Sequence, residues 1–403
     1  MDRLTIVVFA LVYLGMIFGK YPGLAMDRTG MALLGAIVLI VAGRVGEQEA
    51  WRAIDVPTIV LLLGLMVVSS QLRLGGFYTY VTRKIAAAEV SPRALLALVI
   101  GSMAVLSAVL TNDVICLAVT PVLIEGCARR KLNPVPYLLA LACAANIGSA
   151  ATLIGNPQNM LIGQSLNLSF AGYLFDAIIP SMLGLAVVWV VIVVHTRGKW
   201  HMETALPAYE APVFNPWQTT KGLTAIVALI VIFLFAPWPR DIVALAAAGI
   251  LLLSRKMESR AIMGLVDWHL LLLFMGLFII NHAFQSTGAL DAIAECLRGN
   301  RIDVSQPGWL FAAIVVLSNL VSNVPATMLL LPSATHSSAG AILALASTFA
   351  GNLFIVGSIA NIIVVEQAAR FGIRITWQEH ARIGLPITIV TLGIAAAWLW
   401  LLG

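Results

Sequence analysis

The sequence predicts an all-α polytopic membrane protein made of two inverted repeats of five spans, each with a re-entrant hairpin and a broken helix. Of its 403 residues, 60% are hydrophobic and 11% are charged, with a mean hydropathy of +0.97, whereas a soluble domain carries about 25% charged residues. Apolar segments of span length follow one another along the chain. The polar interruptions of the first half return in the same order in the second half, which indicates an internal repeat.

The first half begins with uninterrupted spans. Apolar segments at 4–19, 29–43 and 56–72 predict the first three. We interpret the first segment as a span and not as a signal peptide, because no clear small-residue cleavage site follows it. Residues 73–93 carry four basic side chains and predict an amphipathic helix on the membrane surface. A span at 172–195 closes this half.

A polar triplet interrupts the next apolar run, 94–126. The triplet is Thr111, Asn112 and Asp113. The arm that follows it, 114–126, is shorter than the roughly 20 residues that a helix needs to cross a bilayer. We therefore predict a re-entrant hairpin that is broken at Asn112 and Asp113, and that enters and leaves on one side.

The segment at 134–165 is also interrupted, by glycines and a proline. Asn156 followed by Pro157 fits a helix N-cap with proline at the first helical position. Because irregular backbone at membrane depth occurs where it lines a cavity, this segment predicts a broken helix beside a binding site.

The second half repeats this order after a polar, proline-containing stretch. We expect a first repeat at 1–195, a cytoplasmic linker at 196–221 and a second repeat at 222–403. The predicted elements of the second repeat are spans near 222–237, 241–253 and 266–284, a loop at 285–307, a hairpin at 308–338, a broken helix at 341–368 and a last span at 384–402.

Matching residues recur at nearly constant offsets. Pairs 212 residues apart are Arg28 and Arg240, Asp55 and Asp267, Gly64 and Gly276, and Gly76 and Gly288. At the hairpin tips the offset is 211 residues and joins Ser107 to Ser318 and Asn112 to Asn323, with Val324 in the place of Asp113. The broken segments 153–159 and 355–361 lie 202 residues apart. A repeat over most of the chain is typical of secondary transporters.

The charge distribution gives an orientation. With the N-terminus outside, five crossings per half and hairpins that do not cross, the loops at 20–28, 73–93, 127–133, 196–221, 254–265 and 369–383 face the cytoplasm. The outer side then keeps six basic residues, so 24 − 6 = 18 of the Lys and Arg are cytoplasmic, as the positive-inside rule expects. An odd number of crossings also inverts the second half, so that the two hairpin tips meet near the midplane.

The polar residues near these breaks are the candidates for binding. Because every Lys and Arg is placed in a loop, we expect an anion to be held by backbone N–H groups at the half-helix N-termini that follow Asn112, Asn156, Asn323 and Ser358. A cation would use carbonyl groups and Asp113. The candidate substrate- or ion-binding residues are Thr111, Asn112, Asp113, Asn146, Gly148, Ser149, Thr152, Gly155, Asn156, Ser322, Asn323, Asn352, Gly357 and Ser358.

Each candidate also has a structural interpretation. Asn112 and Asn323 can serve as helix caps alone. Gly148 and the other glycines in the two broken segments can allow close helix packing. Asn146 and Asn352 can bond loose backbone and not substrate. Cys116 and Cys143 are interpreted as packing residues and not as metalloid ligands.

Asp113 has two interpretations. It can cap the second helix of the hairpin, or it can couple transport to H⁺ or Na⁺, since ionisable residues at membrane depth are usually functional. Burial favours the protonated carboxyl group, which suits a proton site. No metal or other cofactor is expected.

Four motifs resemble those of the ion-transporter superfamily. They are Leu110–Val114 with Thr120 and Pro121, Ile154–Asn159, Ser322–Pro325 and Gly357–Asn361. The closest likeness is to its branch of arsenite pumps, sodium–proton antiporters and citrate-transporter-like bacterial anion permeases. The resemblance implies a homodimer whose first spans form a scaffold.

We therefore expect a multi-pass protein of the bacterial inner membrane that moves a small anion or metalloid oxyanion, such as arsenite, by proton-coupled alternating access. The alternatives are a sodium–proton antiporter and a sodium-coupled dicarboxylate or citrate carrier. A channel stays a further possibility. We do not expect an enzyme, because no His-Glu-x-x-His or Gly-x-Ser-x-Gly motif is present, and the basic loops do not indicate a nucleic-acid partner.

Overall fold

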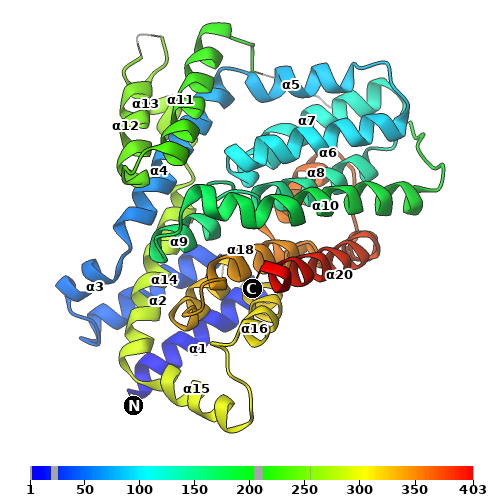
Figure 1. The fold of residues 1–403 in the computed structure, drawn as a ribbon. Coiled ribbons are helices and arrows are strands. Elements are labelled where there is room, and N and C mark those ends of the chain that lie inside the picture. The colour runs from blue at the N-terminus through cyan, green and yellow to red at the C-terminus, as the bar shows by residue number, and fades with distance from the viewer. Residues whose placement is uncertain (1, 20–25, 204–211, 255, 403) are drawn as a thin grey trace.

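The computed structural model describes residues 2–19, 26–203, 212–254 and 256–402, and within these residues the chain is helical without β-strands (Figure 1). The helices are α1 (Arg3–Phe18), α2 (Arg28–Val41), α3 (Glu47–Ala53), α4 (Val56–Leu74), α5 (Phe77–Ala86), α6 (Pro92–Val109), α7 (Asn112–Arg129), α8 (Pro134–Ser149), α9 (Pro157–Ser165) and α10 (Phe170–Thr196) in the first half. The second half holds α11 (Pro216–Phe235), α12 (Arg240–Leu252), α13 (Ser259–Met263), α14 (Trp268–Ser286), α15 (Ala289–Gly299), α16 (Pro307–Val321), α17 (Asn323–Leu330), α18 (Ala339–Ala350), α19 (Ile359–Arg370) and α20 (Trp377–Leu402).

Six of these helices are long and apolar enough to cross a membrane, namely α4, α6, α10, α11, α14 and α20. Five shorter helices, α1, α2, α8, α16 and α18, are also apolar. Helices α8 and α18 are buried among the others, while the remaining nine carry exposed large apolar side chains on their outer faces, as expected where the surrounding solvent is lipid. The prediction of an all-α polytopic membrane protein is confirmed.

In one group of helices, those from the first half of the chain pack against those from the second half. We call this group, α1, α2, α4, α11, α12 and α14, the crossing group. Helix α4 packs against α12, and α14 packs against α2. Gly64 on α4 permits the first contact, because a Cβ atom there would lie 2.7 Å from the carbonyl carbon of Ala244. Gly276 on α14 permits the second, because a Cβ atom there would lie 2.9 Å from that of Ala32.

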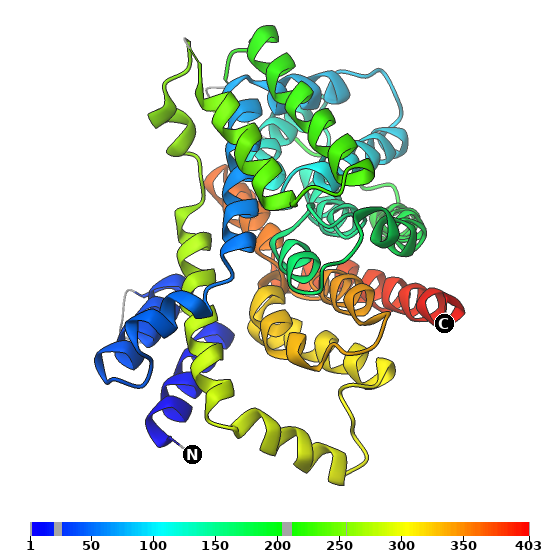
Figure 2. The ribbon, with the colours of Figure 1, turned by 60° about the vertical axis from the view of Figure 1, so that its left-hand side comes forward.

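The second group, α6–α10 with α16–α20, carries the interrupted segments; we call it the site group. Helix α6 packs on α7 and α8, and α16 packs on α17 and α18. Contacts across the halves again come in pairs, because α7 packs on α19 while α17 packs on α9. Helices α10 and α20 lie side by side at one edge (Figures 1 and 2).

The first interrupted run forms two packed helices, but two details of the prediction are wrong. The break falls at Leu110 and Thr111, so Asn112 is already the first residue of α7. The second arm does not end at 126, since α7 continues to Arg129 and has 18 residues. The extra turn forms because Arg129 pairs with Glu125 one turn earlier.

Two other predicted segments, the linker and the loop at 285–307, differ from the structure. The linker is shorter than 196–221, because Thr196 still belongs to α10 and Pro216 already begins α11; its residues 204–211 lie outside the described part of the chain, as do 20–25 of the loop at 20–28 and residue 255 of the loop at 254–265. The loop predicted at 285–307 contains α15, which stands away from the other helices (Figures 1 and 2). A glycine precedes the first residue of α15, as a glycine precedes α5 in the first half.

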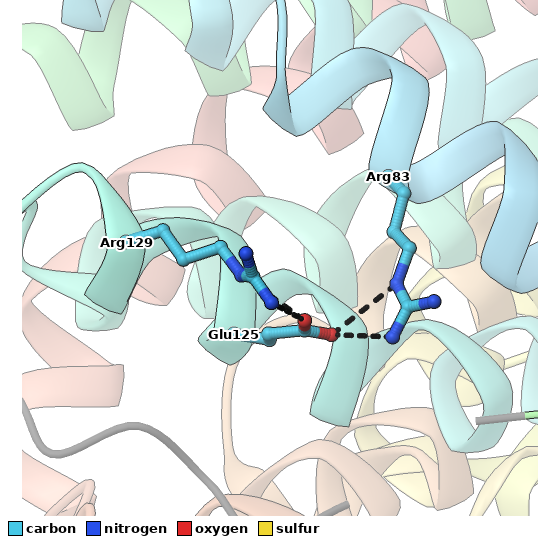
Figure 3. A network of polar contacts seen from close by, with 3 residues as sticks. All are labelled: Arg83, Glu125 and Arg129. Carbon is cyan, nitrogen blue, oxygen red and sulfur yellow. Dashed lines mark hydrogen bonds and ion pairs between the residues drawn. The ribbon is translucent and has the colours of Figure 1, made fainter. Parts of the chain in front are cut away.

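A carboxylate clamps the surface helix α5 onto α7 (Figure 3). Glu125 accepts from Arg83 at 3.1 Å and from Arg129 at 2.8 Å. Next to it, Gly126 lets α7 approach Ala86 closely. The basic amphipathic helix predicted within 73–93 is therefore present as α5.

Candidate functional site

Asn146, near the end of α8, is the centre of a buried hydrogen-bond network. Its amide nitrogen donates to Asn352 Oδ1 at 2.9 Å and to Asn361 Oδ1 at 3.1 Å. Its amide oxygen accepts from Asn112 Nδ2 at 3.2 Å and from Ser358 Oγ at 2.9 Å. The side chain is fully buried, and these four bonds use the whole capacity of an amide.

A second part of the network surrounds Thr348 on α18. Asn156 Nδ2 donates to Ser149 Oγ at 3.0 Å and to Thr348 Oγ1 at 3.4 Å, and Gln158 Nε2 donates to Thr348 Oγ1 at 3.2 Å. In the amide orientation that satisfies both of its ends, Asn323 accepts from Gln158 at 3.2 Å and donates to Gly357 O at 3.2 Å. Ser149 Oγ also donates to Asn146 O at 2.8 Å, which joins the two parts, so both hairpin tips belong to one connected network.

Contacts in the network recur in pairs 202 residues apart. The bond between Asn146 and Ser358 corresponds to the one between Thr348 and Asn156. A second pair of matching residues, Asn159 and Asn361, bonds to the backbone of the unwound loops. Asn159 Nδ2 donates to the carbonyls of Ser149 and Thr152, at 3.5 and 2.9 Å. Asn361 Nδ2 donates to those of Gly351 and Phe354, at 2.8 and 3.1 Å.

Four helices begin at this network, two at the predicted residue and two one residue earlier than predicted. Asn156 is the N-cap of α9 and accepts from Asn159 N at 2.9 Å, with Pro157 as the first helical residue. Ser358 is the N-cap of α19, while α7 and α17 begin at Asn112 and Asn323. The positive ends of four helix dipoles therefore converge on a region that contains no Lys or Arg among its contacts described above.

Asn112 and Asn323 do not occupy the cap positions, which belong to Thr111 and Ser322. The interpretation of these asparagines as caps alone is therefore wrong. Ser322 has a φ of +77°, a conformation that turns the chain sharply into α17. The Thr152 hydroxyl donates to Ala108 O and ties the first broken segment to the hairpin.

The glycines at the breaks allow close approach. A Cβ atom at Gly148 would meet the backbone of Ala104 on α6, so this residue serves packing. At Gly155 a Cβ atom would lie 2.7 Å from Ser107 O, where unwound backbone touches the hairpin. Gly155 O in turn accepts from Asn112 N at 3.1 Å. A Cβ atom at Gly357 would lie 3.2 Å from Gly351 O.

Asp113 is half-buried at the second position of α7. It is not the N-cap, so the capping interpretation is wrong. Its backbone N–H bonds to Asn112 Oδ1 at 3.0 Å, and within the described residues no donor bonds to its carboxylate. The charged group that acts on it is Asp267, at the start of α14 in the crossing group. Leu117, one turn later on α7, lines a cavity together with Arg73 of α4, so this part of α7 borders the crossing group.

Several buried polar atoms at the hairpins lack a protein partner within the described chain. They include Thr111 Oγ1, Asn352 Nδ2 and the matched hydroxyls of Ser107 and Ser318. Such atoms cost free energy unless a solute, ion or water bonds to them. Together with the helix N-termini they make a polar surface for a small solute.

The sequence reasoning missed Gln158, Thr348 and Ser347 as contributors to the network; the Ser347 carbonyl accepts from Asn323 Nδ2 at 3.1 Å. Gln158 corresponds to Ala360, and Thr348 corresponds to Asn146, so a search for identical residues at matching positions does not find them. Asn159 and Asn361 do match at an offset of 202 residues. That match was the available signal for their shared role.

Comparisons with known proteins agree with this architecture. The chain resembles the rice silicon efflux transporter LSI3, with 28% identity over 96% of this chain and 95% of that protein. It also resembles the Escherichia coli inner membrane protein YbiR, with 33% identity over 82% of this chain and 85% of that protein. The crystal structure of the Alcanivorax borkumensis YdaH transporter aligns with a TM-score of 0.63 and 16% identity over 100% of this chain and 98% of that one, which shows the shared fold.

The chain also matches the citrate transporter family, CitMHS, over residues 13–350. The family, LSI3 and YdaH are transporters and not enzymes, and the resemblance to the ion-transporter superfamily is confirmed. The protein belongs to the CitMHS citrate transporter family.

Proposed function

We propose that this membrane transporter moves a small anion or metalloid oxyanion, of the arsenite or antimonite type, across the bacterial inner membrane by proton-coupled alternating access. The observation that carries the proposal is Asp113, an ionisable group without a protein donor on its carboxylate within the described chain, beside a network of neutral amides and hydroxyls. The helix N-termini supply partial positive charge for an anion.

Coupling follows from electrostatics. An ionised Asp113 repels an anion bound at the helix N-termini, while a protonated Asp113 does not. Protonation and anion binding at this site therefore favour each other by linkage. The direction of net flux is then set by the gradients of the proton and of the transported anion.

Alternating access requires one group of helices to move against another. The paired contacts support two inverted repeats, 1–195 and 222–403, joined by a cytoplasmic linker. In this proposal the crossing group is the scaffold and the site group moves, with Asp113 on the moving group and Asp267, the N-cap of α14, on the scaffold. We extend the proposal to a homodimer joined through the scaffold.

The contact pattern at the two ends of the molecule supports the proposed topology. Asn133 N donates to Trp200 O at 2.8 Å, and Asn215 N donates to Gly75 O at 2.9 Å, which joins three of the loops assigned to the cytoplasm. At the other end, Arg240 donates to Gly163 O at 2.7 Å.

Flux into proteoliposomes tests the function. We would compare arsenite, citrate and sodium, with and without a proton gradient. Uptake of arsenite or citrate that accelerates with the proton gradient, and that Asp113→Asn uncouples, supports the proposal. Asp176→Asn is the matched control, since Asp176 lies in α10, outside the network. Flux that ignores both the proton gradient and Asp113 overturns proton coupling.

A second candidate is a sodium-coupled dicarboxylate or citrate carrier, and the family description supports citrate as the solute. A sodium–proton antiporter is the third, since one carboxylate can bind either ion in turn. Citrate uptake that requires sodium identifies the carrier, and sodium flux without an anion identifies the antiporter.

A further inference from the structure

Each of the two outer helices, α10 and α20, sends one side chain to an unwound loop of the network. Tyr173 on α10 donates from its hydroxyl to Ala150 O at 2.6 Å. His380 on α20 is bonded through Nε2 to Asn352 O at 3.1 Å. Ala150 and Asn352 lie 202 residues apart, which is the offset of the two broken segments. The two bonds therefore correspond to each other through the repeat.

The two side chains also stand at the same position of their helices. The Ser169 hydroxyl caps α10, and the Thr376 hydroxyl caps the start of α20 by accepting from a backbone N–H at 3.2 Å. Tyr173 and His380 each follow the cap residue by four positions, and the N–H of each donates to the carbonyl of that residue. One position of the repeat thus carries tyrosine in the first half and histidine in the second.

The carbonyl of Asn352 lies against α20 at two points one turn apart. It accepts from His380, and a Cβ atom at Gly384 would collide with it. Within the described chain no backbone N–H donates to this carbonyl. The side chain of Asn352 accepts from Asn146 at 2.9 Å, and its buried Nδ2 has no protein partner among the described residues. His380 therefore fixes the backbone from which a candidate binding side chain projects.

This bond defines the protonation state of the imidazole. A carbonyl group only accepts, so Nε2 of His380 carries a proton. The side chain is 1% exposed, and its Nδ1 has no partner within the described residues. A second proton on Nδ1 creates a buried cation with an unbonded N–H. The charged donor strengthens its one bond to Asn352 O, but removing an ion without a counter-charge from water costs more. The closed arrangement therefore suits the neutral ring.

The elements packed on α20 give His380 no counter-charge by direct contact within the described residues. They are α10, α18, α8 and the short 3₁₀ turn Ile355–Gly357. Helix α18 and the turn contain no titratable side chain, and on α20 itself the neighbouring Glu379 and Arg382 are exposed. None of the titratable groups of the other two helices bonds to His380. Those groups are Tyr173, Asp176, His195, Tyr137 and Cys143.

We propose that His380 is a positioning residue of the network: in its neutral form it tethers the second unwound loop, residues 352–358, to α20, and uptake of a proton releases that loop. The first unwound loop, residues 150–156, stays tethered, because tyrosine does not gain a proton in the same range of pH. Release of Asn352 removes part of the polar surface that the second half supplies. The two halves of the site therefore respond unequally to acid, and the importance of this for transport rests on the proposed function.

Backbone hydrogen exchange tests the tether without any solute. Mass spectrometry of the purified full-length protein in detergent compares the two loops, after correction for the intrinsic effect of pH on exchange. We expect the protection of residues 352–358, relative to 150–156, to fall about tenfold between about pH 7.5 and about pH 5.5, because histidine gains its proton in this range. The first loop is the internal control.

Two replacements of His380 separate the bond from the titration. His380→Gln places a neutral amide donor at about the same reach, so we expect the second loop to stay protected at both pH values. His380→Leu removes the donor, and we expect the same loop to lose protection at both. Tyr173→Phe is the matched change in the other half and lowers the protection of the first loop without a pH dependence. Size-exclusion profiles confirm that each variant is folded.

Several outcomes overturn the tether. They are an equal pH response of the two loops in the wild type, a pH response that survives in His380→Gln, full protection in His380→Leu, and a His380→Gln loop as unprotected as that of His380→Leu. All of them are independent of flux. The expected exchange in a protein that moves no anion rejects only the proposed function, while proton-coupled anion flux with pH-independent exchange rejects only the tether.

Discussion

Asn146 and Ser358 are joined by a hydrogen bond of 2.9 Å between the two halves of the chain. The corresponding residues Thr348 and Asn156 are also in contact, at 3.4 Å. Each half therefore supplies a side chain near the end of one helix and another at the start of the next. Neither half can complete the network alone, so a shift of one half against the other changes the whole site.

The bonding of Asn146 gives the first prediction. Asn146→Ala removes four hydrogen bonds and leaves buried amides and a hydroxyl unpaired, so we expect it to cost about 2–4 kcal/mol of unfolding free energy. Unfolding in mixed micelles measures this. The matched control is Asn300→Ala, at an exposed site with one bond to Cys296 O, and we expect a change of less than about 0.5 kcal/mol. A loss as small as that of the control contradicts the central role of Asn146.

Asp113 predicts a pH dependence of transport. As the pH rises and the carboxyl group loses its proton, repulsion weakens anion binding, so the KM for the transported anion increases. Asp113→Asn keeps the shape and removes the charge, and its KM stays constant over the same range. Initial uptake rates in proteoliposomes, measured at equal pH on both sides, check this. A variant whose KM follows the wild-type curve assigns the titration to another group.

The glycines of the crossing group predict equal effects in the two halves. Gly64→Val and Gly276→Val each force a side chain against backbone, at Ala244 and Ala32, and we expect each to cost about 1–3 kcal/mol. Gly249→Val is the matched control on α12, because a Cβ atom there meets nothing within 4 Å. Unfolding temperatures in detergent check this. An effect of one glycine without the other contradicts the paired contacts.

Much of this arrangement follows from local signals in the sequence. Asn156 and Pro157 start a helix by the usual capping chemistry, and the structure begins α9 there. The positions of the spans also follow from the sequence, because an uninterrupted run of about 15–20 apolar residues fits the bilayer core and not water. The helix starts near Asn323 and Ser358 follow from the match of the two halves.

Other features depend on packing that the sequence does not display. The pairing of Gln158 with Thr348 joins residues 190 positions apart and has no identical counterpart in the other half. The break before α7 falls earlier than the polar triplet suggests, because Asn112 turns its side chain to Asn146 and its N–H to Gly155 O. Helix α15 escaped prediction because its 11 residues include Asp291, Glu295 and Arg298, so the segment is too short and too charged to be recognised as a span.

The clamp at Glu125 gives the last prediction. The Glu125 side chain is 11% exposed, while those of Arg83 and Arg129 are 51% and 67% exposed. Because each arginine is well solvated, Arg83→Gln or Arg129→Gln alone costs only about 0.5–1 kcal/mol. Together they cost more than the sum, since Glu125 is then left nearly buried without a partner.

A further change separates charge from packing in this clamp. Adding Glu125→Gln to the double variant restores part of the lost stability, because a buried amide costs less than an unpaired carboxylate. Lys131→Gln serves as the control, since its pair with Glu203 is 73% and 85% exposed. Unfolding in mixed micelles at low and high salt checks these values. If the two arginine replacements are strictly additive, Glu125 does not hold α5 on α7. The junction then depends on the close contact of Gly126 with Ala86 and on Arg130, which donates to Ala86 O and Ala88 O at 3.3 and 2.8 Å.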